Sequence, residues 1–341
     1  MTDAHTVEAP LVAAAPRGPA LVGAWRRYSW IVSRVALAVL TLLIVSFVIY
    51  FATILLPGDA AQAVLGRNAS EQALAALREQ LGLNASPVVR YFNWLGGVVT
   101  GDFGQSLISH EPVTAAMWPR VLNTLLLVGL TAVIAVPLAL AVGISAGVRQ
   151  GRWWDGIVNT VTIILAGLPE FVVALLLVVV FSTGLFHVLP AVVILAPGAS
   201  PISFPAALVL PIATLVIITV PYLIKQMRSS LIESLSSEYV TMAELKGLPQ
   251  RVVVFRHAVR NSLIPSIQAT ALSIAFLIGG SVVVEFLFQY PGMGLALTSA
   301  VTQRDIPVLQ FLVLVMAAGY VGFNLIADIL TVLATPKLRT R

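Results

Sequence analysis

The chain has 341 residues, of which 58% are hydrophobic and only 10% are charged, and its mean hydropathy is +0.95. A soluble chain of this length cannot bury so much apolar surface, so the composition excludes an ordinary soluble domain and indicates a membrane protein. The net charge of +5 does not argue for a nucleic-acid partner, and the absence of cysteine excludes disulfides, cysteine-ligated metal sites and thiol nucleophiles.

Residues 1–24 are rich in alanine and proline and lack a periodic apolar pattern, so we predict a disordered cytoplasmic tail. A membrane-spanning helix needs about 20 mostly apolar residues. Six segments between 25 and 341 meet this requirement and predict an all-α membrane protein with six transmembrane helices: 31–56, 121–147, 157–181, 206–224, 263–286 and 307–334. The apolar run 188–197 contains two prolines and is too short to span, so we expect a re-entrant or surface segment there.

The distribution of positive charge predicts the orientation. If the N-terminus is cytoplasmic, most of the 20 lysines and arginines fall on cytoplasmic segments, as the positive-inside rule requires. We therefore expect a multi-pass protein with both termini in the cytoplasm. Its external loop would cover 57–120, and its main cytoplasmic loop would cover 225–262.

The external loop carries signals for local structure. Asn68 or Ser70 can cap a short helix that ends at Gly82, and Ser86 followed by Pro87 can begin a second helix. The turn-rich stretch GDFGQS, Gly101 to Ser106, comes next. We predict a small structured cap without catalytic residues.

The cytoplasmic loop reads as two short helices. Ser230 with Glu233 fits a capping box, Gly247 is a natural stop for the first helix, and Pro249 can restart a helix at its first position. Pro265 then marks the entry into the fifth span.

The first of these helices is expected to expose Tyr239, Met242 and Ala243 beside Glu244 and Lys246. An amphipathic helix that projects from a membrane protein needs a partner surface. Periodicity alone leaves two partners open, which are a protein and anionic lipid headgroups.

Several motifs resemble one family. AELKG (Ala243 to Gly247), FRHAVRN (Phe255 to Asn261) and Ile264-Pro265 resemble the cytoplasmic loop of ATP-binding-cassette (ABC) importer permeases of the dipeptide/oligopeptide/nickel family. The stretches GDFGQS, GGSVVVEFLFQYPGMG (279–294) and RDIPVLQ (304–310) are similar to other motifs of that family, and Asn324 and Asp328 match its last span. The resemblance covers about residues 30–341, in the family's order.

The resemblance implies a bacterial inner-membrane subunit, the first permease of an importer, whose cytoplasmic loop contacts an ATPase. The expected partners are a second related permease, two ATPase subunits or one fused ATPase, an external substrate-binding protein and membrane lipid. The expected cargo is a di- or oligopeptide, with nickel chelates, glutathione and opines as alternatives. The expected ATPase-coupling residues are Tyr239, Thr241, Met242, Ala243, Glu244, Leu245, Lys246, Gly247 and Leu248.

This chain departs from the family at Thr241, Glu244 and Leu245, where the family has small or basic residues, and at its end, where Thr335, Pro336 and Lys337 stand. The sequence contains no G-x-x-x-x-G-K-[ST] phosphate-binding loop. We therefore predict a non-enzymatic subunit without its own cofactor, with ATP and magnesium bound by the partner ATPase.

Two other classes of protein compete with this interpretation. The string Gly143-Ile-Ser145-Ala-Gly147 would suit an intramembrane serine protease, but no histidine lies within a predicted span to act as its base. Packing of small residues, through Gly143 and Gly147, is the simpler reading. A secondary transporter or channel would need internal repeats or several buried ionisable residues, and no clear repeat is visible.

Three acidic residues lie in or near spans. Glu170 follows Pro169 and would lie past the middle of the third span, where a carboxylate must face the bundle interior, a water-filled path or a structural partner. Glu285 would lie near the outer surface, either as an interfacial residue or on the translocation path. Asn324 and Asp328 share a helix face and suit a polar contact with a neighbouring helix.

Overall fold

The computed structural model of the protein describes residues 20–55, 70–80, 85–195 and 198–334. Within these residues the secondary structure is helical, and the only β-type contact is one isolated bridge between Gln105 and Pro112. Five helices are long and apolar enough to cross a membrane, and a sixth candidate is a sharply bent helix pair. The predicted all-α membrane architecture is confirmed.

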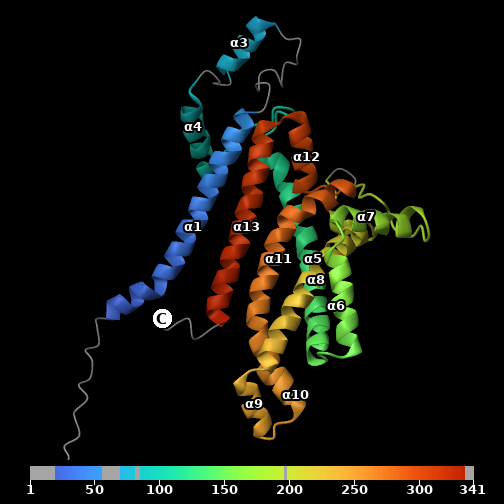
Figure 1. Cartoon of the computed structure of the whole chain (residues 1–341). Helices are drawn as coiled ribbons and strands as arrows, with labels where there is room; N and C mark the ends of the chain where they lie inside the picture. The colour runs from blue at the N-terminus through green and yellow to red at the C-terminus, as the bar shows by residue number, and fades with distance from the viewer. Residues whose placement is uncertain (1–19, 56–69, 81–84, 196–197, 335–341) are drawn as a thin grey trace, which may run out of the picture.

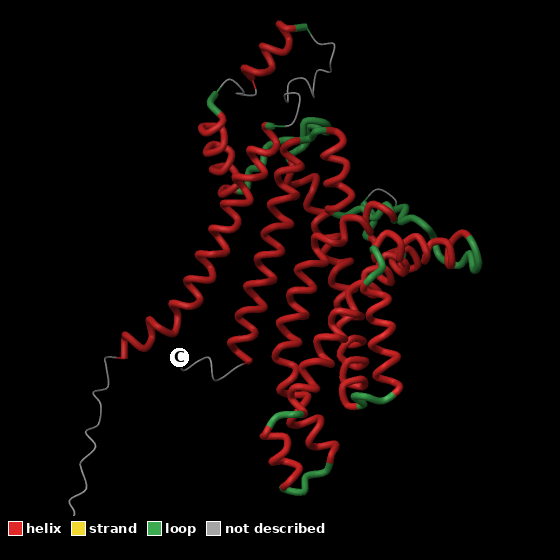
Figure 2. The backbone as a smooth tube through the Cα atoms, in the orientation of Figure 1, coloured by secondary structure: helices red, strands yellow, loops and turns green. Residues whose placement is uncertain are grey.

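The long helices run side by side with loops gathered mainly at the two ends of the bundle (Figures 1 and 2). They are α1 (Ala20–Ile54), α5 (Val113–Val148), α8 (Pro205–Leu235), α11 (Arg260–Leu287) and α13 (Ile306–Ala334). Helix α11 is preceded without a break by α10 (Gln250–Val252) and a π-helical segment, Val253–Val259. Pro265 therefore lies inside a continuous helix. The prediction that it marks the entry into the fifth span is wrong.

Helix α1 begins inside the segment that we predicted to be a disordered tail. Residues 20–24 are helical, so that part of the prediction is wrong, and residues 1–19 lie outside the described part of the chain. The helix packs against α13 and against α4 (Pro87–Thr100), which belongs to the loop predicted to be external. Figure 1 shows the N-terminal part of α1 leaning away from the bundle.

The third predicted span is not one continuous helix. It consists of α6 (Trp153–Ala166), α7 (Glu170–Val178) and a π-helical turn, Val179–Thr183, and the chain bends by 98° between α6 and α7. The break falls where Pro169 cannot donate a backbone hydrogen bond and Gly167 ends α6. Glu170 therefore begins a helix instead of lying in the middle of one, and α7 projects sideways from the bundle (Figure 1).

The helix caps predicted in the external loop are present. Ser70 precedes α3 (Glu71–Gln80) and accepts a hydrogen bond from the Ala73 N–H at 3.3 Å, and Ser86 accepts one from Val89 at 3.4 Å at the start of α4. The predicted stop at Gly82 lies outside the described residues. The segment 188–195, predicted to be re-entrant or superficial, forms no helix.

Helices α5 and α8 make the most extensive contact in the bundle, and glycines on α5 permit it. A Cβ atom added at Gly143 would lie 2.9 Å from Met227 Cβ and 3.0 Å from the Ile224 carbonyl oxygen, and one at Gly147 would lie 3.0 Å from Leu231 Cδ2. Small residues at this spacing let helix backbones approach closely, as we predicted. The interface buries Met227 and Leu231 completely.

We predict that Gly143→Ala destabilises the protein because the new methyl group meets a backbone oxygen that cannot move without shifting α8. Overpacking of this kind costs about 1–3 kcal/mol of unfolding free energy. Gly129→Ala is the matched control, since a Cβ at this position on the same helix meets nothing within 4 Å. Thermal unfolding in detergent, followed by tryptophan fluorescence, should show a lower midpoint for Gly143→Ala only. Equal midpoints for the two variants would contradict the packing argument.

Candidate functional site

The loop between α8 and α11, which we predicted to be cytoplasmic, contains a short helix held at the end of the bundle (Figure 1). Helix α8 continues to Leu235, so Ser230 is buried within it and the predicted capping box is wrong. Helix α9 (Glu238–Leu245) follows, and Gly247 has a φ of +74°, the left-handed conformation typical of the residue after a helix. The Gly247 N–H donates to the Glu244 carbonyl at 2.8 Å, so the predicted stop is confirmed. Pro249 is the N-cap residue of α10, whereas we predicted it to be the first residue of the helix.

One face of α9 is anchored to the rest of the protein. Val240 and Ala243 are buried in a cluster with Met227 and Leu231 of α8 and with residues of the π-helical segment. Ala243 was predicted to be exposed, and it faces inward instead. Ser234 donates to the Ala258 carbonyl oxygen at 3.0 Å, which fixes the end of α8 to the same segment.

The opposite face of α9 is apolar and exposed. Tyr239, Met242 and Leu245 recur every third residue and are 43%, 60% and 76% exposed. We call these three residues the coupling face. Large apolar side chains gathered on a surface that projects from the bundle indicate a contact with a partner protein or with the membrane. The other predicted coupling residues Thr241, Glu244, Lys246, Gly247 and Leu248 are also exposed.

An ion pair connects the base of α6 to α8, the helix that leads to α9. Arg228 donates to both carboxylate oxygens of Asp155, at 2.5 and 2.8 Å, and the Gly151 N–H donates to the same carboxylate at 3.0 Å. The pair is largely shielded from solvent, with 6% of the Asp155 side chain exposed. Bidentate geometry makes this a strong and specific contact.

The serine of the G-x-S-x-G string has no catalytic environment. Ser145 donates to the Val142 carbonyl at 2.8 Å and accepts from Trp154 Nε1 at 3.1 Å. Neither partner is a base that could activate a nucleophile. The G-x-S-x-G string is therefore explained by contacts between helices, which are these two hydrogen bonds and the packing of Gly143 and Gly147.

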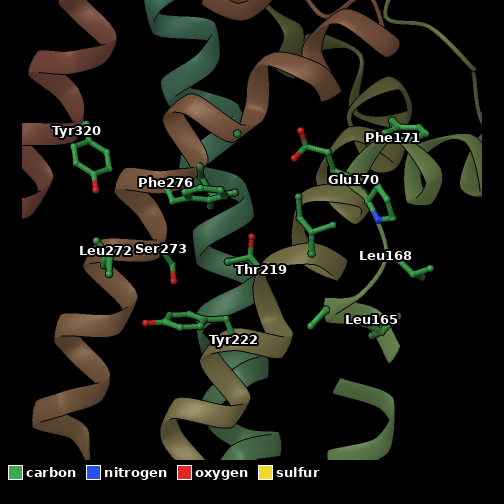
Figure 3. A pocket seen from close by; sticks show the side chains of 15 residues that line it. Leu165, Leu168, Glu170, Phe171, Thr219, Tyr222, Leu272, Ser273, Phe276 and Tyr320 are labelled. Atoms are coloured by element: carbon green, nitrogen blue, oxygen red, sulfur yellow. The ribbon is translucent and has the colours of Figure 1, made fainter. Parts of the chain in front are cut away.

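A cavity of about 790 Å³ opens at the break between α6 and α7. Its walls come from the break itself and from α8, α11 and α13 (Figure 3). The lining is mostly apolar and aromatic, with Tyr222, Phe276 and Tyr320 around it and Thr219 and Ser273 as polar groups. A concave apolar site with a few polar groups is the usual form of a small-molecule pocket.

Glu170 lines this cavity. It is partly buried, and its carboxylate faces α11, where a Cβ atom added at Gly280 would lie 3.9 Å from Oε2. Within the described part of the chain, Glu170 has no hydrogen bond or ion pair. A carboxylate at this depth needs a charged or polar partner. Its role on a translocation path remains a prediction.

Glu285 occupies a different environment, because its side chain has no exposed surface. Thr124 of α5 donates to Oε1 at 2.6 Å and Ser281 donates at 3.2 Å, while the N–H groups of Gly294 and Leu295 donate to Oε2 at 2.6 and 3.3 Å. The last two donors belong to the first turn of α12 (Met293–Gln303). The carboxylate thus caps α12 and joins it to α5 and α11.

The loop between α11 and α12 fits closely around this carboxylate. A side chain at Gly292 would overlap the carboxylate itself, so only glycine fits. Burial raises the pKa of Tyr290, which keeps its hydroxyl protonated, and this hydroxyl donates to the Asn123 carbonyl at 2.7 Å. Asn123 in turn donates to the Pro291 carbonyl at 2.8 Å. This conformation therefore does not support the predicted path role of Glu285, whose oxygens are occupied by its own chain.

Two motifs that lie far apart in the sequence meet at the end of the bundle where α5 and α13 begin. Ser106 of GDFGQS donates a hydrogen bond to the Asp305 carboxylate, and the Leu107 N–H donates to the same carboxylate at 3.2 Å. Phe103 and Phe311 pack edge to face with ring centres 4.8 Å apart. The GDFGQS turn is therefore fastened to the connection between α12 and α13.

The residues predicted for contacts of the last span divide into two cases. Asp328 forms an ion pair with Arg34 of α1 at 2.5 Å, which fits the predicted polar contact with a neighbouring helix. Asn324 donates to the Tyr320 carbonyl of its own helix at 3.0 Å and makes no such contact with another described helix.

Sequence reasoning missed Thr124, Asp155 and the aromatic residues of the cavity. Asp155 carried a usable signal, since a lone acid beside an apolar span needs a cation, and Arg228 stands just after the predicted fourth span. Thr124 carried none, because threonine is unremarkable in an apolar span.

Comparison with known proteins identifies two matching families. Residues 27–127 match the N-terminal part of binding-protein-dependent transport system membrane components, and residues 139–340 match the binding-protein-dependent transport system inner membrane component. The glutathione transport system permease protein GsiC of Salmonella choleraesuis (strain SC-B67) is 34% identical over 311 residues, which cover 91% of this chain and 99% of the relative. A putative peptide transport system permease protein of Brucella abortus (strain 2308) is 32% identical over 309 residues, which cover 91% and 98%.

We predict that Glu285→Ala destabilises the protein strongly. The Thr124 hydroxyl and the N–H groups of Gly294 and Leu295 would lose their acceptor, and each stranded group costs about 1–3 kcal/mol. We therefore expect a loss of at least about 3 kcal/mol of unfolding free energy, seen as a lower thermal midpoint and poor yield. Glu170→Gln is the control, since it breaks no hydrogen bond within the described chain. A Glu285→Ala variant of normal stability that transports slowly would restore the path role of this residue.

Proposed function

The chain belongs to the family of binding-protein-dependent transport system inner membrane components, and from this premise we propose that it forms half of the translocation path of an importer for di- or oligopeptides. Membership makes it a multi-pass, non-catalytic permease subunit of the inner membrane. It also implies a partner ATPase and an external substrate-binding protein.

The assembly that we propose contains a second related permease and two ATPase subunits, or one fused ATPase. The ATPase binds ATP and magnesium, and the coupling face of α9 docks onto it. Both termini are proposed to be cytoplasmic. In support, the beginning of α1 and the end of α13 lie at the same end of the molecule as α9 (Figure 1).

The arrangement of α8 and α11 supports an alternating-access mechanism. Both helices line the cavity, through Tyr222 and Phe276, and both lead to the cluster that anchors α9. A displacement of α9 by the ATPase would therefore move two walls of the cavity together. The Asp155–Arg228 pair would carry the same displacement to α6, whose other end forms the third wall.

The single observation that favours a peptide is the carboxylate of Glu170 in an otherwise mainly apolar cavity. A peptide brings a cationic terminal amine that can meet this carboxylate in transit. The relatives named for peptide and glutathione transport point the same way, since glutathione also has a free amine. Glutathione, nickel chelates and opines remain the alternatives within this family.

The coupling proposal is tested by crosslinking from single cysteines. The chain has no native cysteine, so each introduced thiol is unique. Leu245→Cys, on the coupling face, should crosslink to the ATPase in the assembled complex. Gln150→Cys, an exposed position on the turn between α5 and α6, is the control and should not. Reaction of Leu245→Cys with lipid-borne reagents alone would show that α9 rests on headgroups, and the coupling proposal would fail.

We predict that Glu170→Gln leaves stability, assembly and basal ATP hydrolysis intact but slows transport of a peptide with a free amine. Loss of one charge-assisted hydrogen bond, worth about 1.5–3 kcal/mol, corresponds to roughly a tenfold or greater loss of rate. Transport of the N-acetylated peptide should change much less, because it lacks the charged amine. Uptake is measured in proteoliposomes.

Glu111→Gln is the matched control for Glu170→Gln, since it neutralises an exposed carboxylate in the external loop. It should leave uptake of both peptides unchanged. If Glu170→Gln transports normally while Glu170→Ala no longer assembles with the second permease, Glu170 is a structural contact and not a path residue.

A further inference from the structure

A second cavity of about 600 Å³ lies at the end of the bundle that carries α9. It is enclosed by the end of α5, the turn that leads to α6, and the α10 segment. Three arginines line it: Arg149 and Arg152 from the turn, and Arg251 from α10. Residues about 100 positions apart in the sequence therefore bring three positive charges to one pocket.

These charges are not neutralised within the described part of the chain. Arg149 Nη1 donates to the Ser145 carbonyl at 3.3 Å, and none of the three arginines forms an ion pair with a described carboxylate. Asp155 is the acid of the same region, and it is already engaged by Arg228 in bidentate geometry. The pocket therefore offers guanidinium groups to an anion from outside the chain.

Apart from the polar residues Ser145 and Gln250, the rest of the pocket lining is apolar, and exposed apolar side chains follow it along α6. Val148 and Phe255 line it with 43% and 64% of their surfaces exposed. Directly along α6 from Arg152, Trp153 is 75% exposed and Ile157 is 47% exposed. Tryptophan at the end of a membrane-spanning helix marks the boundary between headgroups and acyl chains. The site thus combines a cationic end with an apolar surface that leads into the membrane.

We propose that this pocket binds an anionic phospholipid of the cytoplasmic leaflet. The phosphodiester group would lie among Arg149, Arg152 and Arg251, and an acyl chain would follow Phe255 and the exposed side of α6. Basic pockets between membrane helices on the cytoplasmic side recognise such headgroups. The exposed aromatic and aliphatic side chains favour a lipid over an acidic surface of the ATPase, for which the coupling face of α9 is available.

A lipid at this site would bridge two moving parts. Its headgroup would contact the turn between α5 and α6 and also α10, which continues into α11. The lipid would therefore hold the base of α6 beside the segment that anchors α9.

The test measures lipid retention by the purified importer complex. The complex in neutral detergent is titrated with phosphatidylglycerol or phosphatidylcholine, and bound lipid is counted by native mass spectrometry. We expect each arginine-to-glutamine change at Arg149, Arg152 and Arg251 to weaken phosphatidylglycerol binding by roughly fivefold. Phosphatidylcholine binding should not change, and excess inorganic phosphate should not displace the lipid.

The matched comparison is Arg251→Gln against Arg256→Gln, which removes an exposed arginine of the same segment outside the pocket. The proposal fails if both variants lose phosphatidylglycerol equally, since the attraction would then be unspecific. It fails if inorganic phosphate displaces the lipid completely. It also fails if the triple variant keeps its lipid but no longer retains the ATPase, because the pocket would then be a protein interface.

Discussion

The membrane offers no water to polar groups, and the fold depends on how the chain meets this constraint by itself. Several charged side chains on the apolar helices each join one helix to another. Glu285 joins α11 to α5 and α12, Arg34 and Asp328 join α1 to α13, and Asp155 and Arg228 join α6 to α8. Apolar packing alone would allow these helices to slide, whereas directional bonds fix their register.

One continuous element passes through all the parts to which we assign a role. From Gln250 to Leu287 the chain is helical for 38 residues, or roughly 57 Å at 1.5 Å per residue. One end meets the α9 cluster, the middle lines the cavity, and the other end carries Glu285. The segment near the α9 end is π-helical and has wider turns than an α-helix. Such segments frequently occur at functional sites.

Features encoded locally were predictable from the sequence. Length and apolarity located the long helices, Ser86 marked a helix start, and the left-handed Gly247 marked a helix end. Features that depend on contacts between distant segments were not predictable. Thr124 and Glu285 lie 161 positions apart, and only their meeting shows that this acid is structural. The inward turn of Ala243 likewise depends on how α9 rests on α8, and Pro169 alone does not give the 98° bend before Glu170.

The break between α6 and α7 changes the electric field inside the bundle. An unbroken spanning helix has the ends of its macrodipole at the two membrane surfaces, each equivalent to roughly half an elementary charge. Here the negative end of α6, at Ala166, and the positive end of α7, at Glu170, both lie beside the cavity. The anionic side chain of Glu170 occupies the first position of α7, where it is stabilised by the backbone of its own helix. The bend thus places a fixed dipole beside the cavity, and a molecule with separated charges would be oriented by it.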